Sequence, residues 1–516
     1  MLLTCKYVFV CNLTNFKSIG ENQKMRKLKK GGIVLLAAVL VALFIPLFTA
    51  CSLMGDKFSN FSHYSMDITL RYDDKAIDVS MTLDYRNNYD VELKDLHLHI
   101  FANAFREDAQ FRPVAAHEMA DAFPNGASWG GIDIKSVSVA GSSVPVEIIG
   151  EDYNVLRAPF ANALMPGHRT NIQIEFSVQL ANVRHRLGWY NGLINLGNFF
   201  PIAAVFQNGA FATNVYYYLG DPFFSAASNF DVSITKPSNL TAAMSGATVR
   251  EANGGTATTT ASIQGARDFA IVLGEFEVIH QMVGDVQVRY YFHNDSESAK
   301  NLQAAVDSMV TFSDMFGAYP WATFSTVQTA FLHGGMEFPA LTMISDELSG
   351  DTFREVIIHE AAHQWWYAVV GNDQVRHSWI DESLTQMATS LFFEANPQYG
   401  VTYESRMAEA LSMLTLYAQV FRDQPNFSTA MCRPLGEFAN SLEYVVMAYY
   451  KGKIMLDVVR TQIGNEAFML ALRNLYADNM FGVIDRDLFI AAFETASQRQ
   501  LAPFFDAWLD GTIAVF

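Results

Sequence analysis

The chain has 516 residues, of which half are apolar and 17% are charged, and its formal net charge is −18. This composition is typical of a globular protein rather than a disordered one, and the length predicts two or three domains. The acidic balance argues against a nucleic-acid-binding surface, because contact with phosphates requires a basic face.

The first fifty residues carry a targeting signal and are set apart from the folded part of the chain. A basic stretch begins at Met25, an almost wholly apolar run extends from Ile33 to Phe48, and Thr49-Ala50 precede Cys51. A small residue directly before a cysteine, after such a run, resembles a bacterial lipoprotein signal. That resemblance implies cleavage before Cys51, a lipid on its thiol, and an extracytoplasmic protein anchored to a membrane. Because the run approaches the ~20 residues of a membrane-spanning helix, an uncleaved signal anchor is the alternative.

This interpretation divides the N-terminal region into three segments. Residues 1–24 are an upstream mis-start, residues 25–50 are the signal peptide, and residues 51–64 are a linker. Of the four cysteines, only Cys51 and Cys432 remain after cleavage. With Cys51 lipidated, no disulfide framework and no cysteine-type zinc site can form.

Residues 65–279 are predicted to form an antiparallel β domain. Apolar residues alternate with polar ones from Met66 to Tyr72 and from Ile77 to Tyr85, which predicts strands with one buried and one solvent-facing side. His97 and His99 share the polar side of the next such stretch. Two histidines at this spacing could bind a metal, but a solvent-facing side of a strand is the preferred interpretation.

The hydrophobic period changes near residue 280, and residues 280–516 are predicted to form a mainly helical domain. One helix is expected over residues 300–316, because its pattern stops at Gly317 shortly before Pro320. Further helical patterns cover about 352–370, 379–395, 402–422, 443–463 and 465–478.

The stretch His359-Glu360-Ala361-Ala362-His363 lies within the helix predicted over residues 352–370. Thr352 and Glu355 stand at capping-box spacing at its start, and Gly371 stands at its expected end. Residues i and i+4 of a helix lie one above the other, so both imidazoles can reach the same point. This pattern predicts a pair of metal ligands.

A third ligand is predicted nineteen residues after His363. Ser378 and Asp381 stand at capping-box spacing, so Glu382 falls in the first turn of the next helix. A carboxylate there can return to the histidine pair, and two imidazoles with one carboxylate leave a tetrahedral zinc one open position for water. The alternative for Glu382 is a carboxylate that only complements the helix dipole. We therefore expect one zinc ion per chain, with Glu360 as the general base beside the open position.

The spacing of these residues is similar to that of the zinc aminopeptidases of peptidase family M1. Three segments match family motifs in the right order. Gly334-Gly335-Met336-Glu337 resembles the G-x-M-E-N motif, Trp379-Ile380-Asp381-Glu382-Ser383 resembles W-L-N-E-G, and Tyr449-Tyr450-Lys451-Gly452 resembles Y-E-K-G. The layout matches over about residues 60–516, whereas the specific motifs lie within residues 330–455.

The resemblance implies an α+β multidomain fold, with a saddle of antiparallel β-sheets followed by a thermolysin-like catalytic domain. It implies a substrate-binding segment in which Gly334 and Gly335 pair with the peptide backbone and Glu337 binds the free α-amine. Tyr449 is expected to donate to the oxyanion. The plainer alternatives are a surface-loop carboxylate for Glu337 and a core aromatic for Tyr449.

The sequence also departs from the family pattern. Phe338 stands where the G-x-M-E-N motif has asparagine. The family's F-P-C-F-D-E-P element has only a weak counterpart in residues 199–203, without the acidic residues, so no second amine-binding residue is assigned. The chain ends where the family's catalytic domain ends, so a more open cleft is expected.

The expected function is removal of N-terminal residues from peptides. A thermolysin-like endopeptidase is the first alternative, and a relative of the leukotriene-type epoxide hydrolases is another. A non-catalytic peptide-binding lipoprotein is the alternative from a different class, and a broken ligand set would favour it.

Overall fold

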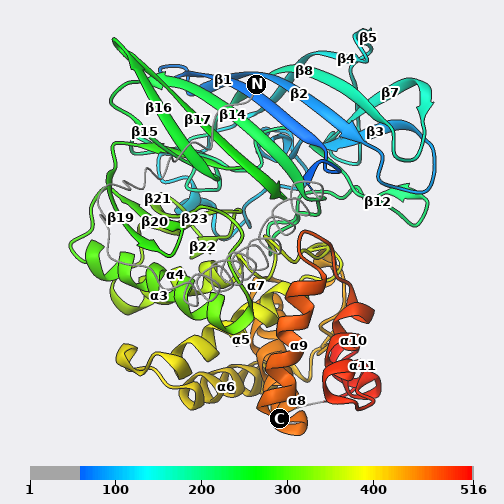
Figure 1. Ribbon diagram of the computed structural model, residues 1–516, viewed down its shortest axis with the longest axis vertical. Coiled ribbons are helices and arrows are strands. Elements are labelled where there is room, and N and C mark those ends of the chain that lie inside the picture. Colours follow the sequence, from blue (N-terminus) through cyan, green and yellow to red (C-terminus); the bar gives the residue numbers. More distant parts are fainter. Residues whose placement is uncertain (1–57, 514–516) are drawn as a thin grey trace, which may run out of the picture. The chain divides into compact units, whose positions relative to one another are not determined.

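Strands dominate the first half of the chain in the computed structural model, which describes residues 58–513 (Figure 1). The predicted signal peptide and Cys51 lie outside the described residues. Within residues 58–513, no helix is long and apolar enough to cross a membrane.

The largest sheet has eight strands, and all neighbouring pairs are antiparallel except the parallel pair β1–β14. The predicted alternation is confirmed in β1, where Met66 and Ile68 are buried while Asp67 and Thr69 are exposed. In spatial order the strands are β16 (Ala247–Asn253), β17 (Thr256–Ala266), β14 (Ser228–Pro237), β1 (His63–Arg71), β2 (Ala76–Arg86), β8 (Arg169–Gln179), β4 (Gly131–Val139) and β5 (Ser142–Val144).

Two four-stranded sheets and one hairpin complete the N-terminal β region. The first sheet is β15 (Thr241–Met244), β18 (Ile271–Gly274), β10 (Leu193–Leu196) and β9 (Leu187–Tyr190). The second is β11 (Ile202–Ala203), β3 (Leu93–His99), β7 (Val155–Leu164) and β6 (Glu147–Ile149), and the hairpin is β12 (Phe206–Gln207) with β13 (Ala210–Phe211). The short helix α2 (Met119–Ala122) also belongs to this region.

The histidines of β3 do not lie on a solvent-facing side. His99 is fully buried, its Nε2 is 3.2 Å from the Ala212 carbonyl oxygen, and its ring stacks on Phe101. His97 stacks on Phe211 and is partly covered. The solvent-facing interpretation is wrong, because the segment after β13 covers this side of β3.

A five-stranded sheet opens the C-terminal region, although its sequence predicted mainly helices. Its strands are β19 (Glu277–Val283), β20 (Val286–Phe292), β21 (Thr323–Thr329), β23 (Leu341–Ser345) and β22 (Gly335–Met336). The three strands β20, β21 and β23 are parallel neighbours. Every residue of β21 and β23 is buried, so these strands lack the alternation that identifies a strand with one wet face.

Helices form the rest of the C-terminal region. The predictions over 300–316, 379–395, 402–422 and 465–478 are confirmed within two residues, whereas the last two helices were not predicted. The helices are α3 (Ser298–Phe316), α4 (Gly350–Ala362), α5 (Trp379–Ala395), α6 (Tyr403–Phe421), α7 (Ser441–Tyr444), α8 (Gly452–Ile463), α9 (Asn465–Asp478), α10 (Arg486–Ser497) and α11 (Ala502–Leu509). The helical pattern expected over 443–463 is confirmed, but its first part, Val445–Lys451, is π-helical and lies between α7 and α8.

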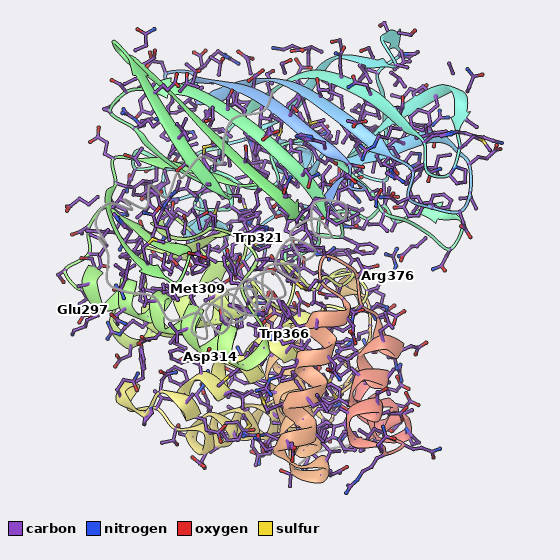
Figure 2. All side chains as sticks on the ribbon, in the orientation of Figure 1. Glu297, Met309, Asp314, Trp321, Trp366 and Arg376 are labelled. Atoms are coloured by element: carbon purple, nitrogen blue, oxygen red, sulfur yellow. The ribbon has the colours of Figure 1, made fainter. Side chains whose placement is uncertain are left out.

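The helix predicted over residues 352–370 is too long. α4 begins at Gly350 without a side-chain cap and ends at Ala362, so neither the predicted capping box nor Gly371 sets its limits. Tyr367, at φ 139°, cannot continue a right-handed helix. The turn buries Trp366, whose ring lies 5.0 Å from that of Phe316 (Figure 2). Burial of this large aromatic surface favours the turn over further helix.

Two side chains join the β region to the helical region. Arg267, which follows β17, is buried and donates to the carbonyl oxygens of residues 225, 367, 369 and 482. Burial lowers the pKa of this guanidinium to about 10. Trp321 donates from its indole nitrogen to the Gln264 carbonyl at 2.8 Å (Figure 2). The Arg267 bonds fix the turn after α4 against the β region.

Candidate metal centre and active site

The two histidines of the predicted motif lie one helical turn apart at the end of α4. Their Nε2 atoms are 3.2 Å apart. The Nδ1 atom of His363 is 3.1 Å from the Trp366 carbonyl oxygen and 3.0 Å from the Thr385 hydroxyl. A carbonyl oxygen can only accept a hydrogen bond, so the Nδ1 atom of His363 carries the ring proton. The Nε2 atom of His363 then has a free lone pair, which faces His359. The turn after α4 therefore orients a metal ligand.

Glu382 closes the triangle from the first turn of α5. Its Oε2 atom lies 3.6 Å from Nε2 of His359 and 3.4 Å from Nε2 of His363. The carboxylate is buried, and Oε2 has no hydrogen-bond donor among the described residues. Burial alone would raise the pKa of Glu382, but the two histidines, His363 foremost, lower it to about 2.

These three atoms fit a zinc ion. Zinc–ligand distances of about 2.0–2.1 Å place tetrahedral ligands roughly 3.3–3.4 Å from one another. The three observed separations of 3.2, 3.4 and 3.6 Å match that edge. Two imidazoles and one carboxylate form the donor set of a catalytic zinc with one open position.

Glu360 lies beside the triangle and lines the catalytic cavity. Its Oε2 atom is buried and has no partner in the described part of the chain. Burial raises the pKa of this carboxyl well above its usual value, which increases its affinity for a proton. Glycine is needed opposite it, because a Cβ on Gly335 would lie 2.3 Å from the Glu360 carboxylate. At Gly334 a Cβ would meet Val356 at an ordinary 3.7 Å.

Glu337 follows β22 and is buried, not on a surface loop. It accepts a hydrogen bond from Gln374 at 3.0 Å. Glu337, Glu360 and His363 each place one ligand-type atom within 4.8 Å of the others. Burial, followed by the nearby Asp221 carboxylate, raises the pKa of Glu337 to about 8.

Tyr449 belongs to the π-helical segment between α7 and α8. Its hydroxyl donates to Oε1 of Glu382 at 2.5 Å, and its ring stacks on His359. It also lines the catalytic cavity, so it is not a core aromatic. Single π-helical turns often occur at functional sites, where the extra residue redirects a side chain.

Residues 199–203, the weak counterpart of the family's F-P-C-F-D-E-P element, belong to the hydrophobic core and do not line the catalytic cavity. Phe199 and Phe200 are fully buried, and Phe200 packs against Tyr64. Phe338, in place of the motif's asparagine, is also buried, and a Cβ on Gly197 would lie 2.4 Å from its ring. The substitution thus fills space between β22 and the sheet strand β10.

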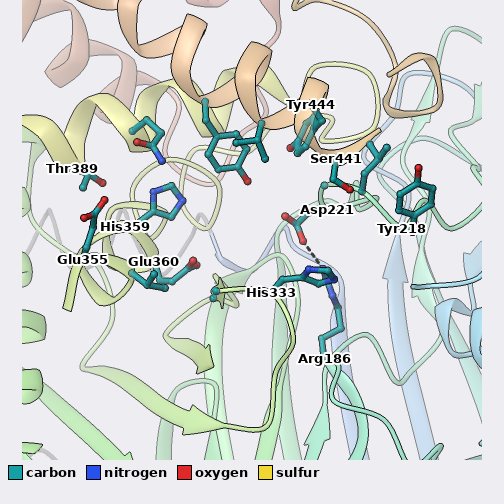
Figure 3. A pocket seen from close by; sticks show the side chains of 18 of the residues that line it. Arg186, Tyr218, Asp221, His333, Glu355, His359, Glu360, Thr389, Ser441 and Tyr444 are labelled. Carbon is teal, nitrogen blue, oxygen red and sulfur yellow. Dashed lines mark hydrogen bonds and ion pairs between the residues drawn. The ribbon is translucent and has the colours of Figure 1, made fainter. Parts of the chain in front are cut away.

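Arg186 and Asp221 are among the charged residues of the cavity that the sequence analysis missed. Arg186 donates from Nη1 to Oδ1 of Asp221 at 2.5 Å (Figure 3). The same Nη1 lies 3.1 Å from Sδ of Met336. Both residues lie in irregular segments of the β region, without a motif or a periodic pattern. No sequence signal could have brought them to the metal centre.

The catalytic cavity has a volume of about 320 Å³. In Figure 3, Glu355 and Thr389 lie on one side of His359, and Asp221, His333 and Tyr444 lie on the other. The metal centre therefore lies between two chemically different ends of one cavity.

Comparison with known proteins is consistent with this arrangement. Residues 300–508 match the model of the peptidase family M1 domain. The chain is 27% identical to aminopeptidase N of Lactobacillus delbrueckii subsp. lactis over 158 residues, which is 30% of this chain and 18% of that protein. It is 34% identical to aminopeptidase B of Mus musculus over 98 residues, or 18% of this chain and 15% of that protein. The aligned part thus spans less than a fifth of either relative.

The fold as a whole also has a solved counterpart. The M1 zinc metallopeptidase from Deinococcus radiodurans superposes with a TM-score of 0.61 over 88% of this chain and 94% of its own, at 16% identity. The two-part fold expected from the sequence is therefore confirmed.

Proposed function

We propose that this chain, whose residues 300–508 match the model of the peptidase family M1 domain, is a zinc-dependent metallopeptidase that removes residues from the free amino end of peptides. One observation carries this proposal. Glu337 is a buried carboxylate beside the metal centre, and the Asp221 carboxylate, which lines the cavity, lies near enough to raise the pKa of Glu337. Such a pair is suited to an ammonium group.

The other residues of the site supply the hydrolytic chemistry. His359, His363 and Glu382 would hold the zinc ion, which would lower the pKa of a water molecule and polarise the scissile carbonyl group. Glu360, with its free Oε2 atom, can take a proton from the attacking water and give it to the leaving amine. Tyr449 can turn its hydroxyl from Glu382 toward the developing oxyanion.

Recognition of the amine would set the register of cleavage. A free α-amine is cationic below its pKa of about 8 and pairs strongly with a carboxylate in a water-poor site. Arg186 holds Asp221 in place and contacts Met336, the neighbour of Glu337. With the amine fixed at that end, only the first peptide bond reaches the metal centre.

Matched free-amine and N-acetylated fluorogenic peptides, with and without chelator, test this function. We expect strong preference for the free amine and loss of all activity on chelation. Glu337→Gln keeps the volume of the side chain but removes the group that can give its proton up and pair with the ammonium group as a carboxylate, so cleavage of free-amine peptides should fall about 10²-fold. Equal rates on free and acetylated peptides would instead identify an endopeptidase.

We also propose that the protein is an extracytoplasmic lipoprotein anchored to a membrane through Cys51. The support is the sequence alone, in which a basic stretch and an apolar run precede Ala50-Cys51. Expression from Met25 in the presence of labelled fatty acid should give a labelled membrane protein, and Cys51→Ser should abolish the label. An unlabelled protein of full precursor size would support an uncleaved signal anchor.

A further inference from the structure

We infer that the end of the cavity at Glu355 receives the second residue of the substrate and favours lysine or arginine there. The inference rests on the proposed aminopeptidase function. It assigns a substrate class to a part of the cavity that neither the metal ligands nor the amine-binding carboxylates use.

The direction of the bound peptide follows from the two ends of the cavity. The amine-binding end is marked by Arg186, whose Nη1 atom contacts both Asp221 and the side chain of Met336, next to Glu337. Glu355 lies on the opposite side of His359 from Asp221 (Figure 3). A peptide with its amine near Asp221 and its first carbonyl at the metal centre must therefore continue toward Glu355.

Three side chains that line the cavity at this end, Glu355, Gln386 and Thr389, offer acceptor oxygen atoms to a ligand. The Thr389 hydroxyl donates to the Thr385 carbonyl at 2.8 Å, which leaves only its lone pairs for a ligand. Gln386 lies one turn before Thr389 on α5 and also lines the cavity; its Oε1 atom has no partner among the described residues, while its amide nitrogen can donate. Glu355 is a third acceptor, and about one-third of its side-chain surface is exposed. A ligand group with several N–H donors satisfies this set.

The charge of this end is also negative. Arg406 pairs with Glu355 and with Glu409 at 2.8 Å, so one guanidinium is shared by two carboxylates. Lys453 lies behind this group and is fully buried, and burial lowers the pKa of its ammonium to about 7. At neutral pH it adds less than a full positive charge, and it does not line the cavity. A cationic side chain of the substrate would balance the excess carboxylate.

The test uses free-amine peptides that differ only at the second residue, with lysine, alanine or glutamate there. For the wild-type protein we expect kcat/KM to be about tenfold higher with lysine than with glutamate, because attraction of one charge and repulsion of the other act together. Glu355→Gln should bring this ratio close to one. Glu355→Lys should invert it, which is a gain that a misfolded variant could not produce.

Glu409→Gln is the matched control. Glu409 also pairs with Arg406 but does not line the cavity, so this variant should keep the wild-type ratio. A lysine-to-glutamate ratio near one for the wild-type protein would overturn this inference. A ratio that does not change in either Glu355 variant would overturn it as well, and both results would leave the aminopeptidase function intact. Failure to cleave any free-amine peptide would instead overturn the proposed function.

Discussion

Two carboxyl groups of the site, those of Glu360 and Glu382, are buried in a way that raises the free energy of the folded protein when no ligand is bound. Buried oxygen atoms of Glu360 and Glu382 have no donor in residues 58–513. A buried, unpartnered carboxylate oxygen costs free energy of folding, typically about 1–3 kcal/mol or more. The two atoms belong to the residues that would hold the metal and move the proton, so the cost is concentrated where the chemistry requires it.

The first prediction separates metal binding from catalysis. Glu360→Gln keeps the shape of the side chain and leaves the three ligands in place, so the purified variant should retain one zinc per chain. Because it cannot accept a proton, kcat should fall by several orders of magnitude. Zinc content by elemental analysis and kcat on a free-amine peptide are the measurements. Alanine at His359, His363 or Glu382 should lose the zinc, and full zinc retention in those variants would contradict the assignment.

A second residue-scale prediction concerns Tyr449. Tyr449→Phe removes one hydroxyl that can donate to the oxyanion, while the ring can still stack on His359. Removal of one such donor typically lowers kcat by about 10²–10³. Steady-state kinetics should show this loss with little change in KM. A large rise in KM with kcat maintained would make Tyr449 a binding residue.

At the scale of elements, the site depends on how closely β22 approaches α4. β22 is an edge strand of the five-stranded sheet and pairs with β23, and α4 lies beside it, so the Gly335 backbone approaches the Glu360 side chain closely. The turn after α4 orients His363, and the π-helical segment brings Tyr449 to Glu382. The site is therefore completed by the close approach of β22 to α4, by the turn after α4 and by the π-helical segment.

The third prediction tests this approach of strand to helix. A Cβ at Gly335 would lie 2.3 Å from Glu360, so Gly335→Ala should displace the general base. Misplacement by about 1 Å can lower a rate about 10²-fold, so we expect a loss of that order in kcat with zinc retained. Gly334→Ala is the control, since its Cβ has room beside Val356. Similar losses in both variants would show that close contact with Glu360 is not the reason for glycine.

At the scale of the whole molecule, the junction between the β region and the helical region contains buried charge. Asp268, next to Arg267, is buried and accepts hydrogen bonds from the Phe269 backbone N–H and the Asn198 amide. Burial raises the pKa of Asp268 to about 7. The folded protein therefore binds a proton at this carboxyl over a pH range in which the unfolded chain has released it.

The fourth prediction follows from this difference in proton binding. Between pH 3.8, the ordinary pKa, and about pH 7, the folded state binds more protons at Asp268 than the unfolded chain does. The stability that this proton contributes is therefore complete below pH 3.8 and is lost as the pH rises through about 7. This group alone should lower the free energy of unfolding by up to about 4 kcal/mol across that range. Denaturant unfolding of Asp268→Asn should lack this part of the pH dependence. If the free energy of unfolding of this variant depends on pH as in the wild-type protein, the proton is bound at another group.

Much of the fold and the metal centre could be predicted from local patterns. Alternation along β1 and β2 identified strands because one side of each is buried and the other is wet. The i, i+4 spacing of His359 and His363 identified two candidate ligands because a helix brings such residues to one face, and the start of the next helix identified Glu382 as the third candidate. Fully buried strands such as β21 were missed, because burial on both sides removes the alternation.

What the sequence determined by itself is the chemistry that is local along the chain: the histidine pair, the base between them, the carboxylate of the following helix and the tyrosine of a short motif. Only the tertiary structure decided which distant groups face that centre. Arg186 and Asp221 reach it from loops of the β region, and Glu355 acquires its place at the opposite end of the cavity from the packing of α4 against α5 and α6. These groups share no helical or strand period with the motif. Their meeting depends on burial of apolar surface between elements far apart in sequence, which no local pattern records.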